Sequence, residues 1–434
     1  MKQTDQWRPT PAHARAMLAG LLLSVTAVLA RRPDLLVTAT PFAVAAAWAV
    51  LLRPVESPVV RHSVGHHTVR EGQATTWHIH VDDPDGRVDD VVAALDPPTW
   101  VDRKPADGQT VVSLADDGSE PLAMVVRPSR WGCHQVGPAL VVASSALGGF
   151  RWASRPWIQQ QRLVALPVPT PFDAAAPPVH VPGLVGVNRS PRYGSGTEFA
   201  SIRPFQLGDR LKRIHWGHSL RTGDLHVTTT WADHDRHVVL MLDAFHDVGE
   251  SGGIEGRASS LDISVRAAAA IAEHFARVGD RVALTMIGAR GAQRVPPGAG
   301  FRHLRRLLEV MASVEPANAE HDDGRLPPGL PPGALVVMLS PLTSPRSLQR
   351  ATMIADRGMS VIVIDCLPPD ITDEQAGDPY VALAWRVEVL KREHQIRVAR
   401  EAGVAVVPWR GPGSIDLVLR GLQRRSGSGA GRSR

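Results

Sequence analysis

The chain has 434 residues, of which 44% are hydrophobic and 21% are charged, so it can form two or three folded units that each bury a core. Its formal charge is only +5 and acidic residues are spread through the same regions as basic ones, which argues against a nucleic-acid-binding protein. Cys133 and Cys366 lie far apart and make a poor disulfide framework, which fits a reducing compartment or buried thiols.

Two strongly apolar runs stand near the N-terminus, at residues 16–30 and 35–52. A membrane-spanning helix needs about 17 to 25 residues, and the first run is slightly short of that length. A cleaved signal peptide is the alternative for the first run, but the second run follows closely, and arginines stand where a small-residue cleavage site would be. We therefore predict that residues 1–54 form a transmembrane helical hairpin, a multi-pass anchor in the cell membrane. Arginines flank both sides of the runs, so charge alone does not fix the orientation.

Short β-branched runs separated by Asp, Gly and Pro fill residues 55–169. Period-two alternation bounded by turn residues is typical of strands that are buried on one face. The candidate strands are residues 74–81, 110–114, 122–126, 139–143 and 162–168. This pattern predicts a small all-β sandwich.

Residues 170–235 begin with a proline-rich linker and continue into a stretch rich in arginine, glycine and aromatic residues, which we name the signature segment, residues 186–230. A connection of this length is usually functional or disordered, and its aromatic residues argue against disorder. Its candidate functional side chains are Glu198, Arg203, Asp209, Arg210, Arg213, His215, Trp216 and Arg221.

Three interpretations of these side chains remain open. They could form a charged surface with an exposed aromatic residue that docks a protein partner. Ion pairs of Arg203 and Arg213 with Asp209 could instead pin the segment to the sheet, with the aromatic residues filling a seam between domains. In the third interpretation His215, paired with Asp209 or Glu198, is an acid–base set, although no serine or cysteine lies in a recognisable nucleophile motif.

Strands and helices alternate through residues 236–424, which predicts a doubly wound α/β domain with a parallel sheet. The run HVVLMLD at 237–243 is apolar throughout, as expected of a strand that is buried on both faces. The other predicted strands are 281–287, 334–339, 360–365 and 404–407, and the predicted helices are 261–278, 301–314, 344–357, 379–402 and 414–423. Residues 425–434 are basic and rich in Ser and Gly, so we expect a disordered tail.

The run GSGTEFASIRPFQLGDRLKRIHWGHSLRTGDLHV resembles the hallmark of a membrane-anchored bacterial family known as domain of unknown function 58. The turn at Arg130, Trp131 and Gly132 also resembles that family. The resemblance implies a C-terminal domain similar to a von Willebrand factor A domain. Family members are typically encoded beside MoxR-type AAA+ ATPases, so the resemblance implies a membrane-anchored, non-catalytic adaptor or assembly factor that binds such an ATPase in the cytoplasm, without a cofactor.

A von Willebrand fold raises the question of a metal-ion-dependent adhesion site, which needs Asp-x-Ser-x-Ser after the first strand. The chain reads DAFHD there, from Asp243 to Asp247, so both hydroxyls are missing. A threonine is not evident in 295–300, and Ser340 stands where a third, acidic contribution is needed. We therefore expect a degenerate loop without metal, in which Asp243 bonds nearby backbone amides. A metal-dependent adhesion module or an envelope-associated enzyme is the alternative function.

Overall fold

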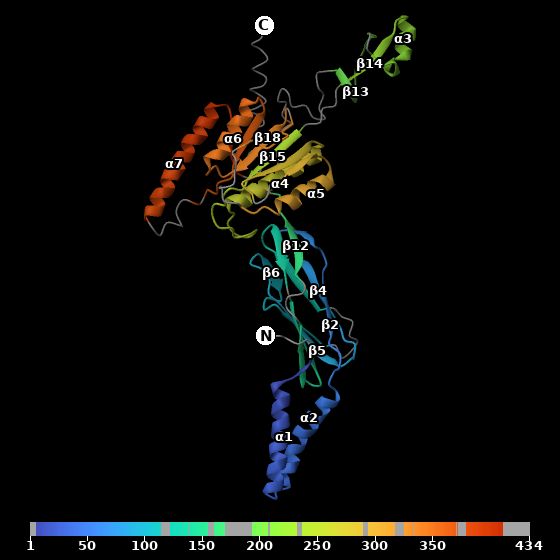
Figure 1. The fold of residues 1–434 in the computed structure, drawn as a ribbon. Helices are drawn as coiled ribbons and strands as arrows, with labels where there is room; N and C mark the ends of the chain where they lie inside the picture. Colours follow the sequence, from blue (N-terminus) through green and yellow to red (C-terminus); the bar gives the residue numbers. More distant parts are fainter. Residues whose placement is uncertain are drawn as a thin grey trace. The chain divides into compact units, whose positions relative to one another are not determined.

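The computed structural model describes residues 6–113, 122–137, 139–154, 160–169, 193–206, 209–231, 237–289, 294–316, 325–331, 333–369, 371 and 379–410. The chain divides into two compact units, Met1–Leu166 and Pro167–Arg434, and their elements are labelled in Figure 1. The predicted linker residues 170–192, the helix at 414–423 and the tail at 425–434 lie outside the described residues.

Two N-terminal helices, α1 (Pro11–Leu29) and α2 (Asp34–Leu51), are long and apolar enough to cross a membrane. Only 17% of the most apolar window of each helix is buried, so their apolar side chains point outward, unlike those of a core helix. The hydroxyls of Ser24 and Thr26 donate to carbonyl oxygens four residues earlier, which satisfies them within the helix, as an apolar solvent requires. A Cβ atom at Gly20 would lie 3.3 Å from the Ala43 nitrogen, so this glycine lets the two helices approach closely.

The residues before α1 belong to the β-rich region. Strand β1 (Arg8–Pro9) pairs with β11 (Phe150–Ala153), and Trp7 is buried in the β core with its Nε1 donating to the Glu56 carbonyl at 2.9 Å. Thr10 caps α1 by accepting from the His13 amide, and its own hydroxyl donates to the Gly148 carbonyl at 2.8 Å. Cleavage after the first apolar helix would therefore remove a strand and a core tryptophan from the region that follows.

The β-rich region consists of three sheets. Its remaining strands are β2 (Val59–Val64), β3 (Thr68–Arg70), β4 (Thr75–Asp82), β5 (Val88–Leu95), β6 (Val101–Lys104), β7 (Gln109–Ser113), β8 (Leu122–Pro128), β9 (Gly132–Val136), β10 (Ala139–Ser145) and β12 (Gln161–Leu166). The sheet orders are β1-β11-β10-β5-β7, β2-β4-β8-β6 and β3-β12-β9. Alternate residues such as Trp77 and Ile79 of β4 and Val91 and Ala93 of β5 are fully buried in one shared core. The predicted β-rich region is confirmed.

A six-stranded sheet forms the centre of the second unit. Its strands are β15 (His237–Asp243), β16 (Arg281–Ile287), β17 (Arg294–Gly298), β18 (Leu335–Ser340), β19 (Ser360–Asp365) and β20 (Ala405–Pro408). Its helices are α4 (Ser260–Val278), α5 (Phe301–Met311), α6 (Pro345–Asp356) and α7 (Pro379–Glu401). The order is β17-β16-β15-β18-β19-β20, so the mixed α/β region predicted from the alternating pattern is confirmed.

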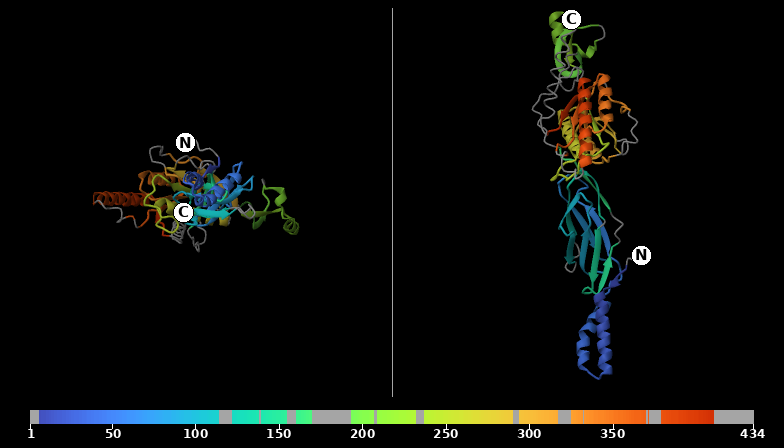
Figure 2. Two further views of the ribbon diagram at one scale, coloured as in Figure 1. Left: turned by 90° about the horizontal axis from the view of Figure 1, so that it is seen from below. Right: turned by 90° about the vertical axis from the view of Figure 1, so that its left-hand side faces the viewer.

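The edge strand β17 differs from the prediction. It pairs antiparallel with β16, whereas the other five strands run parallel, and it is absent from the strands predicted from the sequence. The strand was not predicted because it contains Pro296 and Pro297, and proline is depleted in strands. It forms nevertheless because a sheet edge tolerates proline. In the centre, Val238 through Asp243 are all buried, so both faces of β15 are covered. In the right-hand view of Figure 2, the orange and red helices α6 and α7 lie in front of the sheet.

Helix α4 shows how the local sequence sets an element's ends. Ser259 caps its N-terminus, and Asp262 completes a capping box by accepting from the Ser259 amide. Gly279 ends the helix at φ 90°, a left-handed conformation that favours glycine. The apolar stripe of α4 contacts β15, β16 and β18. These caps place the start of α4 beside the loop that follows β15.

The signature segment forms a β-hairpin with a helical cap, which we name the signature hairpin, residues 193–231. Strand β13 (Tyr193–Pro204) pairs antiparallel with β14 (His226–Trp231). The connection between them holds a short 3-10 helix, η1 (Leu211–Arg213), and helix α3 (Trp216–Thr222). The sequence predicted order here but not these elements, because the apolar residues follow neither a helical nor a strand period over enough length.

Candidate functional site

The signature hairpin exposes most of its apolar side chains. Among its residues whose side chains are described, only Ser219, Val227 and Thr229 are buried. Its exposed large apolar side chains are Phe199, Leu211, Trp216, Leu220 and Leu225. Trp216 is 61% exposed and Leu220 is 82% exposed, and both belong to α3. A single buried apolar residue gives this hairpin almost no core of its own.

An ion pair closes the turn after β13. The Arg203 guanidinium donates two hydrogen bonds to the Asp209 carboxylate, at 2.8 and 2.7 Å, and the Gln206 amide donates a third at 2.9 Å. The bond from Arg203, and then that from the Gln206 amide, hold the pKa of Asp209 below its usual range. Of the ion pairs proposed for this segment, the pair of Arg203 with Asp209 joins two residues of the hairpin itself, where it fixes the turn.

His215 has a structural role in the hairpin. Its Nδ1 accepts a hydrogen bond of 3.0 Å from the His218 amide and so caps α3. The buried Ser219 hydroxyl then ties α3 to β14, because it donates to the His215 carbonyl at 3.0 Å and accepts from the His226 amide at 2.9 Å. His215 and Asp209 thus bond different partners, and the hydrogen bonds described here do not join them as an acid–base pair.

The remaining candidate residues differ in exposure. Arg210 and Arg221 are exposed, and Arg213 is half-buried and acts electrostatically on Asp209. The Glu198 side chain lies outside the described residues, although its backbone belongs to β13. A shallow pocket of about 370 Å³ lies beside the exposed tryptophan, and its lining is Lys212, Arg213, Ile214, His215, Trp216, Gly217 and Thr228.

Sequence reasoning missed the exposed leucines of this hairpin. Leu211 precedes α3 and Leu220 lies within it, so the two leucines join Trp216 as candidate contact residues. The sequence could have indicated their exposure, because an isolated leucine in a short polar stretch has few apolar neighbours to pack against. Their exposure depends on the path of the connection, however, which the residue pattern does not specify.

Asp243, at the end of β15, is the centre of a buried hydrogen-bond network. Its Oδ2 accepts from the hydroxyls of Ser340, at the end of β18, and of Ser347, in α6, the latter at 2.6 Å. Its Oδ1 accepts from the Phe245 amide at 3.0 Å, the type of backbone bond that the sequence led us to expect. Burial raises the pKa of the Asp243 carboxyl, and the three hydrogen bonds oppose that rise.

Asp247 stabilises the start of α4. Its carboxylate accepts from the hydroxyls of Ser259 and Ser260, at 3.0 and 3.3 Å, and from the Leu261 amide at 3.0 Å. A carboxylate at a helix N-terminus is favourable because it satisfies amides that have no partner within the helix. Asp243 and Asp247 therefore use their oxygens in separate networks, and neither network brings the two carboxylates together.

Phe245 occupies the space beside Asp243. Its ring is buried, and a Cβ atom added at Gly288, which lies at φ 71°, would approach that ring to 2.4 Å. A bulky apolar side chain thus stands where an adhesion site would place the first of its two hydroxyls. The arrangement suits a closed structural network better than a metal ion, which needs hard oxygen ligands and room for water.

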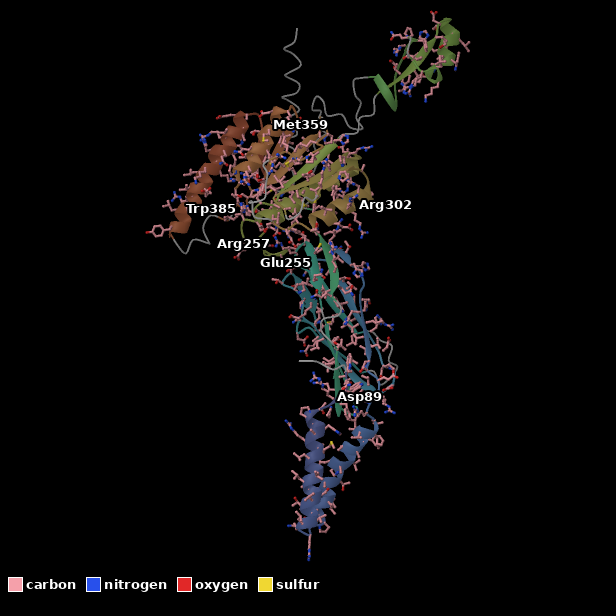
Figure 3. All side chains as sticks on the ribbon, viewed as in Figure 1. Asp89, Glu255, Arg257, Arg302, Met359 and Trp385 are labelled. Carbon is pink, nitrogen blue, oxygen red and sulfur yellow. The ribbon has the colours of Figure 1, made fainter. Side chains whose placement is uncertain are left out.

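A separate hollow of about 650 Å³ lies between the loops that follow β15 and β19. Its lining is Gly249, Glu250, Ser251, Gly252, Arg257, Ala258, Ile263, Pro368, Pro369 and Ile371. Figure 3 labels Arg257 and the neighbouring Glu255 on the loop that precedes α4. The hollow lies where α/β sheets bind ligands, beyond the carboxyl ends of the strands.

Comparison with known proteins places this chain among uncharacterized relatives. The family described as protein of unknown function DUF58 matches residues 201–400. An uncharacterized protein of Mycobacterium bovis and uncharacterized proteins of two Mycobacterium tuberculosis strains are each 30% identical over 202 residues. The matched region covers 46% of this chain and 55% of each relative, so the chain spans about half the length of the curated relatives it matches.

Proposed function

Residues 201–400 belong to the DUF58 family, and from this premise we propose that the protein is a membrane-anchored, non-catalytic adaptor or assembly factor that binds a protein partner. The binding surface is the signature hairpin together with the α/β domain. The partner is a MoxR-type AAA+ ATPase, as the family resemblance of the signature segment implies. The observation that carries the proposal is the exposure of Leu211, Trp216 and Leu220 on the signature hairpin.

The exposed face has the composition of an interface centre. Leu211, Trp216 and Leu220 are exposed. Among its described residues, the hairpin buries only one apolar side chain, that of Val227. Covering such side chains yields about 1.5 to 3 kcal/mol each. Tryptophan and arginine are among the residue types that most often dominate binding, and Arg210 and Arg221 of the hairpin are exposed as well. A protein partner would therefore both bind the hairpin and supply the core that it lacks.

The α/β domain is proposed to be similar to a von Willebrand factor A domain. Five parallel strands with one antiparallel edge strand, in the order β17-β16-β15-β18-β19-β20, support this assignment. Asp243 ends the central strand at the position that begins an adhesion-site loop. Its bonds to Ser340 and Ser347 favour a protein-binding domain that has lost its metal.

The helices α1 and α2 are proposed to anchor the protein as a hairpin, with the soluble domains in the cytoplasm. The pairing of β1 with β11 supports a retained hairpin, because it places residues 8–9 beside the strands that follow α2. Fusing a cytoplasmic and a periplasmic reporter in turn to the C-terminus tests the orientation. Activity of the periplasmic reporter alone would exclude a cytoplasmic ATPase as the direct partner.

Co-purification tests the docking role. The full-length chain, solubilised in detergent, is expected to retain a MoxR-type ATPase encoded beside it, whereas Trp216→Ala and Arg213→Glu lose it. Leu140→Ala is the control, since Leu140 is an exposed apolar residue on β10 of the β-rich region, outside the proposed binding surface. Circular dichroism checks that each variant remains folded. Retention of the ATPase by both hairpin variants at the wild-type level would refute docking through this hairpin.

A further inference from the structure

The turn between β10 and β11 holds an exposed leucine in an unfavourable backbone conformation. Leu147 lies at φ 57° and is 89% exposed, and Ala146 before it lies at φ 55°. The left-handed region is strained for side chains with a Cβ atom, and glycine would relieve that strain. The Asp89 carboxylate holds the turn by accepting from the Leu147 amide at 2.7 Å. Exposure of this apolar side chain to water does not stabilise the protein and so does not offset the backbone strain.

This turn contacts the start of α1 and the end of α2. Thr10, the cap of α1, donates from its amide to Gly149 at 2.9 Å and from its hydroxyl to Gly148 at 2.8 Å. A Cβ atom at Gly149 would come within 2.8 Å of the Ala49 Cβ, in the last turns of α2. Figure 3 labels Asp89 at this end of the β-rich region, next to the helices. The leucine therefore lies at the level where both helices begin to leave the β-rich region.

That level matches the expected surface of a bilayer. Helix α1 has 19 residues, and at about 1.5 Å per residue it is about 28 Å long. The hydrocarbon core of a bilayer is about 30 Å thick. If α1 crosses this core, Thr10 stands at its boundary, and hydrogen bonding to Thr10 fixes the Gly148 carbonyl at the same depth. Leu147, the preceding residue, then meets the boundary between headgroups and acyl chains.

Exposed arginines accompany the turn at this level. They are Arg8, Arg53, Arg87 and Arg151. The Arg53 guanidinium lies 5.5 Å from the centre of the Phe150 ring, and Arg53 accepts through its carbonyl from Arg87 at 3.0 Å. Arg8 and Arg151 are register partners on β1 and β11. Arg8 and Arg53 lie within three residues of a helix end, and Arg151 lies two residues after Gly149. Arg87 is near the turn because its carbonyl accepts from the hydroxyl of Ser145.

The acidic residues at this level bond backbone amides. Asp89 accepts from Leu147, and the Asp85 carboxylate accepts from the amides of Val55 and Glu56, at 2.7 and 2.8 Å. The bonds from the Glu56 and Val55 amides lower the pKa of Asp85, so it stays ionised as a structural acceptor. The arginine side chains are exposed, and guanidinium groups bind phosphate well.

We propose that this end of the β-rich region is a lipid-binding collar, in which Leu147 inserts at the acyl boundary and the surrounding arginines contact phospholipid phosphates. The collar rests on the proposed membrane anchoring and adds a second contact with the bilayer. It explains why an exposed leucine occupies a position suited to glycine. It also holds the β-rich region at a fixed depth, since the collar and both helix ends form one bonded structure.

Depth-dependent fluorescence quenching tests the collar. The full-length chain is reconstituted in vesicles of phosphatidylcholine and phosphatidylglycerol, with Cys133→Ser to remove the exposed thiol, while Cys366 is buried. An environment-sensitive dye is attached to Leu147→Cys, and lipids carry bromine either near the glycerol or near the chain ends. Leu22→Cys, in the middle of α1, reports anchoring. Val111→Cys is the matched control, because Val111 is 62% exposed on β7.

The expected result is quenching of the dye at position 147 by the shallow bromine, of the dye at 22 by the deep bromine, and of the dye at 111 by neither. Quenching at 22 with position 147 behaving like 111 would overturn the collar and leave anchoring intact. Absence of quenching at 22 would overturn anchoring, and the collar with it.

The arginine contacts have their own readout. Arg151→Gln in the Leu147→Cys chain is expected to lower shallow quenching at least twofold, because a surface arginine contributes to attraction by anionic lipid. Unchanged quenching would remove phosphate binding from the proposal. Circular dichroism of the vesicle-bound chains verifies that Arg151→Gln leaves the β-rich region folded.

Discussion

The signature hairpin and the Asp243 network both contain charged residues that the sequence marked as candidates, but the structure uses them in opposite ways. In the hairpin, Trp216 and Leu220 are exposed, and so are Arg210 and Arg221. Around Asp243, serine hydroxyls and a backbone amide satisfy a carboxylate that is 2% exposed. A buried, satisfied network stabilises the protein that contains it, whereas exposed apolar and basic groups are available to a partner.

The pKa shifts of Asp209, in the hairpin, and Asp243, in the buried network, have opposite directions. The pKa of Asp209 is lowered, because Arg203 and an amide bond it near the surface. The pKa of Asp243 is raised, because burial outweighs its hydrogen bonds. The residue type alone does not tell these roles apart, and four experiments can break or sharpen the distinction.

Removal of the buried carboxylate should have the largest effect. Asp243→Ala leaves the hydroxyls of Ser340 and Ser347 without their acceptor and is expected to lower the stability of the α/β domain by about 2 to 4 kcal/mol. Thermal unfolding of the detergent-solubilised chain measures the loss. Glu250→Ala is the control, since Glu250 is exposed on the loop after β15, and it should leave the midpoint unchanged.

A different outcome would restore the metal hypothesis. If calorimetry finds a single Mg²⁺ site in the wild-type chain, and Asp243→Ala abolishes that site without lowering stability, then the carboxylate binds metal. The alternative function as a metal-dependent adhesion module would then replace the adaptor.

Truncation of an exposed leucine in the hairpin should have the next largest effect. Leu220→Ala is expected to weaken binding of the ATPase about tenfold, which corresponds to about 1.4 kcal/mol, with no change in thermal unfolding. Leu140→Ala is the matched control, because Leu140 is an exposed leucine on β10 of the β-rich region, outside the proposed binding surface. Surface plasmon resonance with immobilised ATPase measures both. Equal affinities for the two variants would mean that α3 lies outside the interface.

The pH dependence of stability should show the sign of the Asp243 shift. A carboxyl whose pKa is raised on folding takes up its proton in the folded state first, so acidification through that pKa stabilises the fold. As the pH falls through the raised pKa towards the ordinary aspartate value of about 4, the wild-type midpoint should therefore rise relative to that of Asp243→Asn, which has no proton to gain. A relative fall of the wild-type midpoint would mean that Asp243 is held ionised, as by a bound cation.

Removal of an arginine at the edge of the proposed interface should have the smallest effect. Arg221 is exposed at the end of α3, so Arg221→Ala is expected to change affinity by no more than about twofold at physiological salt. The association rate should respond more than the dissociation rate, and the response should grow at low salt. A tenfold loss that is insensitive to salt would move Arg221 from the rim to the centre of the interface.

The sequence located the central elements closely. The bounds of β15, β16 and β19 agree with the predicted runs, because each strand is largely apolar, begins at a polar residue and is followed by a turn or loop. The two apolar helices were equally visible, since length and composition alone mark them. The candidate site was visible only in part: the residue types Arg203 and Asp209 were identified, while the exposed leucines Leu211 and Leu220 were not.

By itself, then, the sequence determined which stretches are apolar helix, buried strand or polar connection, because those properties repeat along a few neighbouring residues. Only the tertiary structure decided which distant groups meet. Ser340 and Ser347 lie 97 and 104 residues from the Asp243 that they bond, and Thr10 lies 138 residues from the carbonyl that fixes it beside Leu147. Such pairs depend on how the whole chain closes, so no local pattern contains them.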